Sequence, residues 1–175
     1  MKALVILLLS LGLVACATTV PSALQAPGEA LTVAQAQEDA LALRGQVVRW
    51  GGEILSVHNR DDHTELVVLR RPLFDNAEPQ PEGGEAKRFI ARFEGFLDPA
   101  EWRPGQRLTV RGRLDGVQVL MVGDYPYAHP VVRAEASHRW PPWQPPQEPP
   151  WHRDPFYCDP LWPRGPRPYP GSFCW

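Results

Sequence analysis

The spacing of apolar residues along the chain changes from an unbroken run, through a helical stretch, to a two-residue alternation. Residues 3–14 are almost wholly apolar and carry no charge. Residues 32–43 (TVAQAQEDALAL) are rich in alanine, and Thr32 is a suitable helix cap, so a short helix is expected there. From Gly45 the pattern becomes typical of strands. The helix would pack an apolar stripe of Val33, Ala36, Ala40 and Leu43 against a sheet.

Two strands are predicted at the start of the alternating region. The first covers residues 47–57 and contains two adjacent glycines, which often mark a bulge or a sharp bend. The polar segment 58–63 is typical of a turn. Residues 64–69 would therefore return beside the first strand as a hairpin.

A loop and a third strand follow the first hairpin. Residues 72–85 are rich in proline, glycine and acidic residues, and we expect an exposed loop there. Residues 88–93 alternate as a strand does. Asp98 at an N-cap and Pro99 at a first helical position then predict a single helical turn. In the third strand, Phe89, Ala91 and Phe93 would face one side and Arg88, Ile90 and Arg92 the other.

A second hairpin is predicted farther along the chain. Residues 107–114 alternate clearly, and Asp115-Gly116 is the strongest short hairpin signal in the sequence. Residues 117–122 would form the partner strand, and residues 130–136 could form a last one. In the strand before the turn, Leu108, Val110 and Leu114 would point inward, and Arg107, Thr109, Arg111 and Arg113 would point outward.

These elements predict a mainly β domain over residues 32–139. Its order is three strands, a helical turn and two or three more strands, which resembles the OB-fold, a small five-stranded barrel. A general β-sandwich is the alternative. We therefore expect a small OB-like β-barrel with a short helical turn.

The segments on either side of this domain have a different composition. Residues 16–31 are small and polar with two prolines, as expected of a flexible tether. Residues 140–175 hold twelve prolines and five tryptophans and predict an extended, polyproline-like tail. Cys158 and Cys174 in that tail could form a disulfide in an oxidising compartment, remain free thiols, or bond to another chain.

The N-terminal run has the parts of an export signal. Lys2 provides a positive start, and the apolar run after it is shorter than the ~20 residues that span a bilayer. The run ends in Leu-Val-Ala-Cys at residues 13–16, which resembles the lipobox of bacterial lipoproteins. This resemblance implies that residues 1–15 are removed and that Cys16 carries the lipid, with an ordinary secretory signal as the alternative.

Several acyl chains on one residue would hold the protein on a membrane almost permanently, because a single chain binds only reversibly. The residue after the cysteine, Ala17, is not the Asp that often retains lipoproteins in the inner membrane. We therefore expect the outer membrane, with the domain on its periplasmic face. The formal net charge is −2, so the chain lacks the excess of positive charge that is typical of nucleic-acid-binding proteins. No nucleic-acid partner is therefore expected.

Four segments together resemble the Slp family of outer-membrane lipoproteins over roughly residues 16–140. The resemblance implies an envelope protein that, in some members, is associated with starvation or stationary phase. It implies no defined molecular activity. The segments are VRWGGEILSVHNRDDHTELVVLRRPL at 48–73, RFIARFEGFLDP at 88–99, GQRLTVRGRLDG at 105–116 and GDYPYAHPVV at 123–132.

Aromatic residues near the end of the domain are candidates for a binding surface. Tyr125 and Tyr127 flank a proline and could form a ligand-binding lip, or they could close the barrel by packing. Trp140 and Trp143 would share one face of a polyproline helix, which has three residues per turn. Exposed tryptophans in such a tail suggest a partner protein, a glycan or a hydrophobic ligand.

Two other groups of residues have both a chemical and a structural interpretation. His58, Asp61, Asp62 and His63 could bind a divalent metal, but a solvated turn is the favoured interpretation, and neither a metal nor a cofactor is predicted. Trp50 beside the two glycines is expected in the core rather than in a binding site. Arg107, Arg111 and Arg113 could meet lipid phosphates, with a solvated outer face as the default.

No catalytic residues are predicted, because the sequence contains no nucleophile elbow, phosphate loop or metalloprotease helix. The leading hypothesis is a non-enzymatic outer-membrane lipoprotein with a structural or binding role. The alternatives are a periplasmic-side binding module for a partner protein, glycan or lipid, and a small envelope hydrolase.

Overall fold

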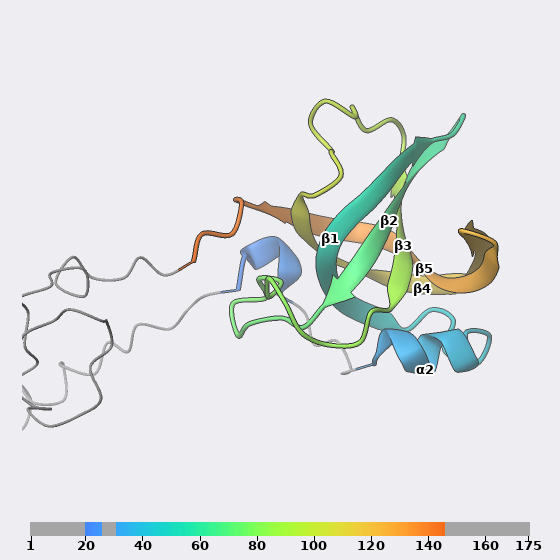
Figure 1. Ribbon diagram of the computed structural model, residues 1–175. Coiled ribbons are helices and arrows are strands. Elements are labelled where there is room, and N and C mark those ends of the chain that lie inside the picture. The colour runs from blue at the N-terminus through green and yellow to red at the C-terminus, as the bar shows by residue number, and fades with distance from the viewer. Residues whose placement is uncertain (1–19, 26–30, 146–175) are drawn as a thin grey trace, which may run out of the picture. The chain divides into compact units, whose positions relative to one another are not determined.

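Five strands hold about half of the residues that the computed structural model describes, which are residues 20–25 and 31–145 (Figure 1). The strands hydrogen-bond in the order β1-β2-β3-β5-β4 and close into a barrel. In chain order the elements are η1 (Ser22–Leu24), α2 (Val33–Glu38), β1 (Val47–Asn59), β2 (His63–Arg71), β3 (Arg88–Glu94), β4 (Arg107–Val122) and β5 (Tyr125–Trp140).

The pairing of the strands is that of an OB-type barrel. β1 pairs antiparallel with β2 and with β4, and β4 pairs antiparallel with β5 along almost their whole length. A short parallel contact between β3 and β5 closes the barrel. A five-stranded, partly open Greek-key barrel is the OB architecture, so the expected OB-like fold is confirmed and the sandwich is not formed.

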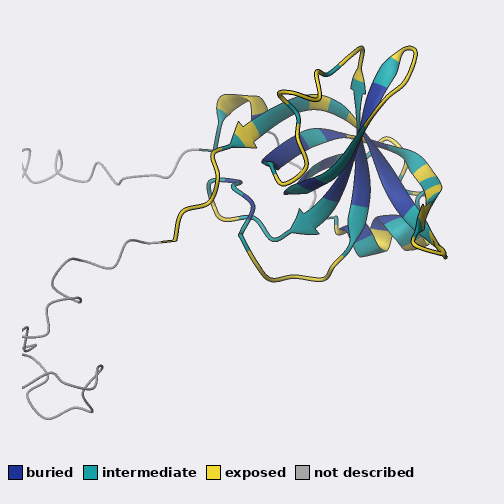
Figure 2. Cartoon of the chain, turned by 45° about the horizontal axis from the view of Figure 1, so that its top comes forward, coloured by how far each residue is buried: buried dark blue, intermediate teal, exposed yellow. Residues whose placement is uncertain are grey.

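Alternate residues of the strands form the main core cluster. Figure 2 shows that the buried residues lie along the strands and the exposed ones mostly in the loops and at the strand ends. Trp50 is 5% exposed, packs edge-on against Phe89 and donates its Nε1–H to the carbonyl of Leu31 at 2.7 Å. The expectation that Trp50 belongs to the core is therefore confirmed. The expected division of β3 also holds, because Phe89 and Ala91 lie in the core while Ile90 belongs to a second cluster with Val67 and Val131.

The hairpin predicted at Asp115-Gly116 is wrong. These two residues lie inside β4, which continues to Val122 and pairs with β5 throughout. Residues 117–122 are therefore the second half of β4 rather than a partner strand. A β-bulge between Leu114 and Gly116 accommodates the Asp-Gly pair, and the chain reverses instead at Gly123, which has a positive φ of 60°.

The last strand is correspondingly longer than expected. It begins at Tyr125 rather than near residue 130, and its first half pairs with the second half of β4. This two-stranded extension, residues 117–130, projects beyond the barrel and curls, as Figure 1 shows at the end of β4 and β5. We call it the β4–β5 arm.

The loop at residues 72–85 covers part of the barrel instead of lying free. Arg107 and Thr109 point outward as predicted, but Arg107 is only 8% exposed and Thr109 is fully buried. Arg107 donates to the carbonyl of Pro79 at 2.9 Å and to Glu78 at 2.8 Å, and Thr109 donates to the carbonyl of Ala77 at 2.6 Å. These bonds fix the loop on the barrel, so the solvated outer face expected for the arginines of this strand is wrong at Arg107.

The helical elements are shorter than the sequence pattern suggested. The predicted cap is confirmed: Thr32 and Gln35 form a capping box at the start of α2. The helix ends at Glu38, well before residue 43, although Leu43 still packs against the core. At Asp98 the chain makes one hydrogen-bonded turn, in which the N–H of Trp102 donates to the carbonyl of Asp98.

A short 3-10 helix, η1, lies within the segment expected as a flexible tether. Leu24 is fully buried, and its carbonyl accepts a bond from Arg49 at 3.3 Å. This segment contacts β4 and β5 as well. Part of the expected tether is therefore packed on the barrel. Among the described residues, no helix is long and apolar enough to cross a membrane.

Candidate functional site

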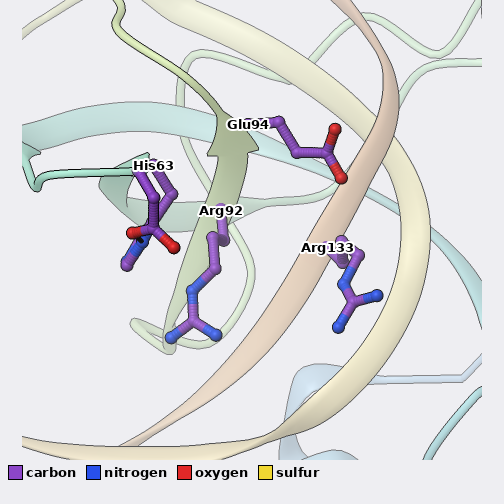
Figure 3. A pocket seen from close by; sticks show the side chains of 5 residues that line it. His63, Arg92, Glu94 and Arg133 are labelled. Atoms are coloured by element: carbon purple, nitrogen blue, oxygen red, sulfur yellow. Dashed lines mark hydrogen bonds and ion pairs between the residues drawn. The ribbon is translucent and has the colours of Figure 1, made fainter.

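A polar pocket of about 260 Å³ opens on the outside of the barrel, over β2, β3 and β5 (Figure 3). The side chains in Figure 3 surround a common space, although they come from segments far apart in the sequence. The pocket is lined by Asp62 from the β1–β2 turn, His63 from β2, Arg92 and Glu94 from β3, and Arg133 from β5.

Strand register explains why these residues meet. His63 lies opposite Glu94, and Arg92 lies opposite Arg133 in the parallel pair that closes the barrel. Their chain neighbours Ala91 and Val132 are buried in the core. Because side chains alternate between the two faces of a strand, the polar residues must project outward together.

A buried ion pair lies beside the pocket. Glu65 is 3% exposed and accepts a hydrogen bond from Arg92 at 2.9 Å, and Arg60 and His63 approach it at 3.6 and 3.4 Å. Burial favours the protonated form of Glu65, but the hydrogen bond and positive charge of Arg92 outweigh it and lower the pKa of the carboxyl. Glu65 therefore stays ionised and fixes Arg92.

Asp115 joins the same network from the bulge in β4. Its carboxylate lies 3.0 Å from Arg44, 3.3 Å from Arg92 and 3.6 Å from Arg133. The hydrogen bond from Arg44, together with the charges of the other two guanidinium groups, lowers the pKa of Asp115. The Asp-Gly pair thus supplies a carboxylate between arginines, which is a different role from the turn expected of it.

At the rim of the pocket, Asp62 contacts His63 at 2.6 Å. The hydrogen bond and the charge of the imidazole lower the pKa of Asp62. The pocket therefore offers two guanidinium groups, an imidazole and two carboxylates, with nearly equal numbers of positive and negative groups. Such a lining suits a ligand with many hydroxyl or amide groups, since both donors and acceptors are available.

Of the cluster expected as a turn, Asp62 and His63 line the pocket and His58 and Asp61 do not. His58 lies on the exposed end of β1, with its Nε2 at 2.9 Å from the hydroxyl of Ser56. Within residues 20–25 and 31–145, no group of three or more metal-ligating side chains is placed to hold an ion.

The predicted aromatic surface is divided between the two ends of β5. Tyr125 is 68% exposed near the tip of the β4–β5 arm, while Tyr127 packs edge-on against the buried His129. Trp140 lies at the other end of the strand, packs edge to face against His138 and donates to the hydroxyl of Thr109 at 3.0 Å. Tyr125 and Tyr127 are therefore not joined to Trp140 in one site.

The remaining predicted site residues precede or follow the strands in the sequence. Trp143 comes three residues after the end of β5 and is 42% exposed. Cys16, Cys158 and Cys174 lie outside the described residues, so their lipid and disulfide stay predictions.

The sequence pattern did not single out Glu65, Arg92, Glu94 or Arg133 as a site. One signal was available for Glu65: it is a charged residue in a strand whose neighbours are nearly all apolar and buried. A buried charge needs a partner, so an outward basic residue on a neighbouring strand could have been sought. The pairing itself depends on the register between distant segments.

Comparison with known proteins places the chain in a family. The model of the "Outer membrane lipoprotein Slp family" matches residues 13–170. The match includes the segment around Cys16 and most of the proline-rich tail, so it extends well past residue 140, where the resemblance was expected to end.

The curated relatives include lipoproteins of the same kind. The "Uncharacterized lipoprotein YeaY" of Escherichia coli (strain K12) is 35% identical over 69% of this chain and 63% of its own length. The "Outer membrane protein Slp" of the same organism is 32% identical over 55% of this chain and 50% of its own length. This chain thus matches less than two thirds of either relative.

Among solved structures, the chain is similar to the small single-stranded DNA-binding protein from Streptomyces coelicolor. The TM-score is 0.35, with 15% sequence identity, over 54% of this chain and 94% of that chain. The family match extends over nearly the whole sequence. This chain therefore belongs to the Slp family of outer membrane lipoproteins.

Proposed function

We propose that this outer-membrane lipoprotein is a non-enzymatic binding module, held by lipid on Cys16, that binds an envelope glycan in the pocket over β2, β3 and β5. The observation that carries this proposal is the position of the pocket. It lies on the β2–β3 face, beside the β1–β2 turn and the β4–β5 arm. The same face and the corresponding loops bind oligosaccharides and oligonucleotides in OB-folds.

The charges of the pocket favour a saccharide over a nucleic acid. Phosphate backbones are bound by surfaces with an excess of Lys and Arg. Here the guanidinium groups of Arg92 and Arg133 are offset by the carboxylates of Asp62, Glu94 and Asp115. A hydroxyl-rich ligand can bond to both kinds of group without leaving either charge uncompensated.

The lowered pKa values of the carboxyl groups in and beside the pocket favour binding of a glycan without its hydrolysis. Hydrolysis of a glycosidic bond needs a carboxylic acid whose pKa is raised, so that it can protonate the leaving oxygen. The pKa values of Asp62 and Glu65 are both lowered, which keeps these groups ionised. They can accept hydrogen bonds from a sugar, but they are poor proton donors near neutral pH.

A titration of the full-length acylated protein in detergent would test the proposed ligand class. The probe is a tetrasaccharide of N-acetylhexosamines, and binding is followed by calorimetry. We expect saturable binding that weakens at least tenfold in Arg133→Ala. Arg139→Ala is the matched control, because Arg139 is also a partly exposed β5 arginine but pairs with Glu101. Equal affinities in the two variants would contradict the proposal.

Two further measurements separate the alternatives. An eight-nucleotide single-stranded DNA should bind at least tenfold more weakly than the tetrasaccharide, and tighter binding of the DNA would exclude the glycan assignment. After prolonged incubation the tetrasaccharide should be recovered intact. Release of shorter sugars by the pure protein would favour an envelope hydrolase instead.

We also propose that acylated Cys16 is the first residue of the mature chain, on the periplasmic face of the membrane. The lipobox-like residues 13–16 support this, since they lie within the family match. Mass spectrometry of the N-terminal peptide should show diacylglyceryl on the cysteine. An unmodified cysteine, or a chain that begins elsewhere, would exclude this mode of attachment.

The association with starvation is a further proposal for this chain, and it rests on the resemblance to family members. Immunoblots of the host should show the protein several-fold more abundant in stationary phase or carbon starvation than in exponential growth. An unchanged amount would remove that role and leave the binding proposal intact.

A further inference from the structure

The position of Leu24 limits how far the barrel can lie from the membrane. Leu24 is fully buried, and the segment around it is folded: its N–H donates to the carbonyl of Pro21, and the side chain of Gln25 donates to the carbonyl of Val20 at 2.9 Å. Only four residue steps separate Cys16 from Val20. At most about 3.6 Å per step, they span roughly 14 Å.

Without this docking the reach would be much greater. The next fixed point is Leu31, whose carbonyl accepts the bond from Trp50. Fifteen residue steps separate Cys16 from Leu31, which corresponds to roughly 50 Å when fully extended. The packing of η1 therefore decides between a barrel next to the headgroups and one that moves freely above them.

The docking also selects which side of the barrel lies nearest to the lipid. The carbonyl of Leu24 accepts its bond from Arg49 on β1. Arg49 lies opposite Arg111 on β4, and Arg111 lies opposite Ala136 on β5. We call this surface, defined by Arg49, Arg111, Arg113 and Ala136, the η1 face. The neighbours Trp50 and Val110 point into the core, so the three arginines point outward.

The η1 face carries charges that suit phospholipid headgroups. Arg111 and Arg113 both reach the single carboxylate of Glu135, at 3.5 and 2.9 Å. The side chain of Arg113 remains 57% exposed. Basic groups near an anionic membrane surface are attracted to it within about a Debye length, which is ~8 Å at physiological salt.

We propose that the η1 face lies against the headgroups of the leaflet that holds the lipid of Cys16. This inference rests on the proposed acylation. The polar pocket begins at the edge of this face, because its Arg133 lies opposite Arg113 on β4. From there the pocket extends to Asp62 in the β1–β2 turn, at the other end of β1 from Arg49.

Energy transfer from the barrel to the bilayer tests this orientation. The full-length acylated chain is placed in vesicles of phosphatidylethanolamine and phosphatidylglycerol that contain an acceptor-labelled lipid. A donor dye is attached through an azide-bearing amino acid, either at position 113 on the η1 face or at position 61 in the β1–β2 turn. We expect clearly higher transfer from position 113. Equal transfer from the two positions would overturn the proposal.

Two insertions of the same twelve-residue Gly/Ser linker test the part played by Leu24. Placed between Thr19 and Val20, the linker lengthens the reach and should reduce the difference between the two dye positions. Placed between Pro27 and Gly28, beyond the docked segment, it should leave the difference unchanged. An equal effect of both insertions would overturn the proposal, because it would show that Leu24 does not hold the barrel.

Mass spectrometry of the same samples distinguishes this inference from the one on which it rests. Protein without lipid on Cys16 would reject the attachment and the orientation together. Acylated protein with equal transfer from both positions would reject the orientation alone.

Discussion

Gly52 on β1 lies so close to the backbone carbonyl of Leu69 on β2 that the strands leave no room for a Cβ atom. We predict that Gly52→Ala lowers the free energy of unfolding by about 3 kcal/mol or more, since the strands must separate or shift. Ser56→Ala on the same strand is the control and should change it by less than about 1 kcal/mol. Urea unfolding followed by circular dichroism measures both, and similar midpoints would contradict the prediction.

Removal of Arg92 should be costly because it leaves Glu65 buried without its closest partner. Breaking a buried ion pair on one side typically costs about 3–5 kcal/mol, and we expect Arg92→Met to lie near the lower end because Arg60 and His63 remain nearby. The double variant Glu65→Met with Arg92→Met should recover much of that loss. Chemical unfolding at pH 7 measures the three proteins.

The exposed ion pair between Arg113 and Glu135 is the comparison for the buried pair between Arg92 and Glu65. Arg113 is more than half exposed and pairs with Glu135 at 2.9 Å. Arg113→Met should therefore cost no more than about 1 kcal/mol. If it destabilised the barrel as much as Arg92→Met, burial of Glu65 would not explain the loss.

His129 should make the barrel less stable as the pH falls toward 5. It is 1% exposed, and burial lowers its pKa below the ordinary value of 6.5, although a bond to the carbonyl of Tyr127 opposes this shift. The unfolded chain therefore binds a proton that the folded chain does not. The free energy of unfolding falls as the pH drops below 6.5, by up to about 1.4 kcal/mol per pH unit.

Replacement of the buried imidazole tests this dependence. His129→Gln should flatten the slope of unfolding free energy between pH 7 and 5, whatever its stability at pH 7. His58→Asn, on the exposed end of β1, should retain the slope of the parent protein. Parallel slopes in all three proteins would show that His129 is not the group responsible.

Arg107 should control access of proteases to the loop that covers the barrel. Its guanidinium donates to Glu78 and to the carbonyls of Pro79 and Pro141. If loss of these hydrogen bonds lowers the free energy of opening the loop by about 1.4 kcal/mol, the population of the open loop rises tenfold. We therefore expect Arg107→Met to be cleaved about ten times faster by trypsin at Lys87.

The control for this measurement is Arg103→Met, which removes an exposed arginine from a neighbouring loop. Its rate of cleavage at Lys87 should equal that of the parent protein. An increase in the control as large as in Arg107→Met would point to general loosening of the barrel instead.

Alternation of apolar residues was sufficient to predict the barrel strands because each strand has one face in the core. Leu108, Val110 and Leu114 are all buried, as expected, and the two glycines beside Trp50 lie where β1 passes closely between its neighbours. The same pattern does not report what covers the outer face. Arg107 and Thr109 are buried by a loop about thirty residues earlier in the chain, which no local pattern reveals.

The error at Asp115-Gly116 shows how a local preference can yield to pairing between strands. Asp-Gly favours a tight turn in isolation. Here β5 pairs with β4 on both sides of the dipeptide, and the chain absorbs the extra residue as a bulge. The pocket was missed for a related reason, since Glu65, Arg92 and Arg133 come together only once the register of three strands is known.

The parallel seam between β3 and β5 is the shortest junction in the barrel wall. It contains three residue pairs, Ile90 with Val131, Ala91 with Val132 and Arg92 with Arg133, whereas β4 and β5 are joined along fifteen. Parallel pairing is also slightly weaker per residue. The barrel should therefore open first between β3 and β5, and the backbone amide hydrogens of this pairing should exchange earliest. Because Arg92 lies on β3 and Arg133 on β5, a sugar that binds both arginines would hold the two strands together.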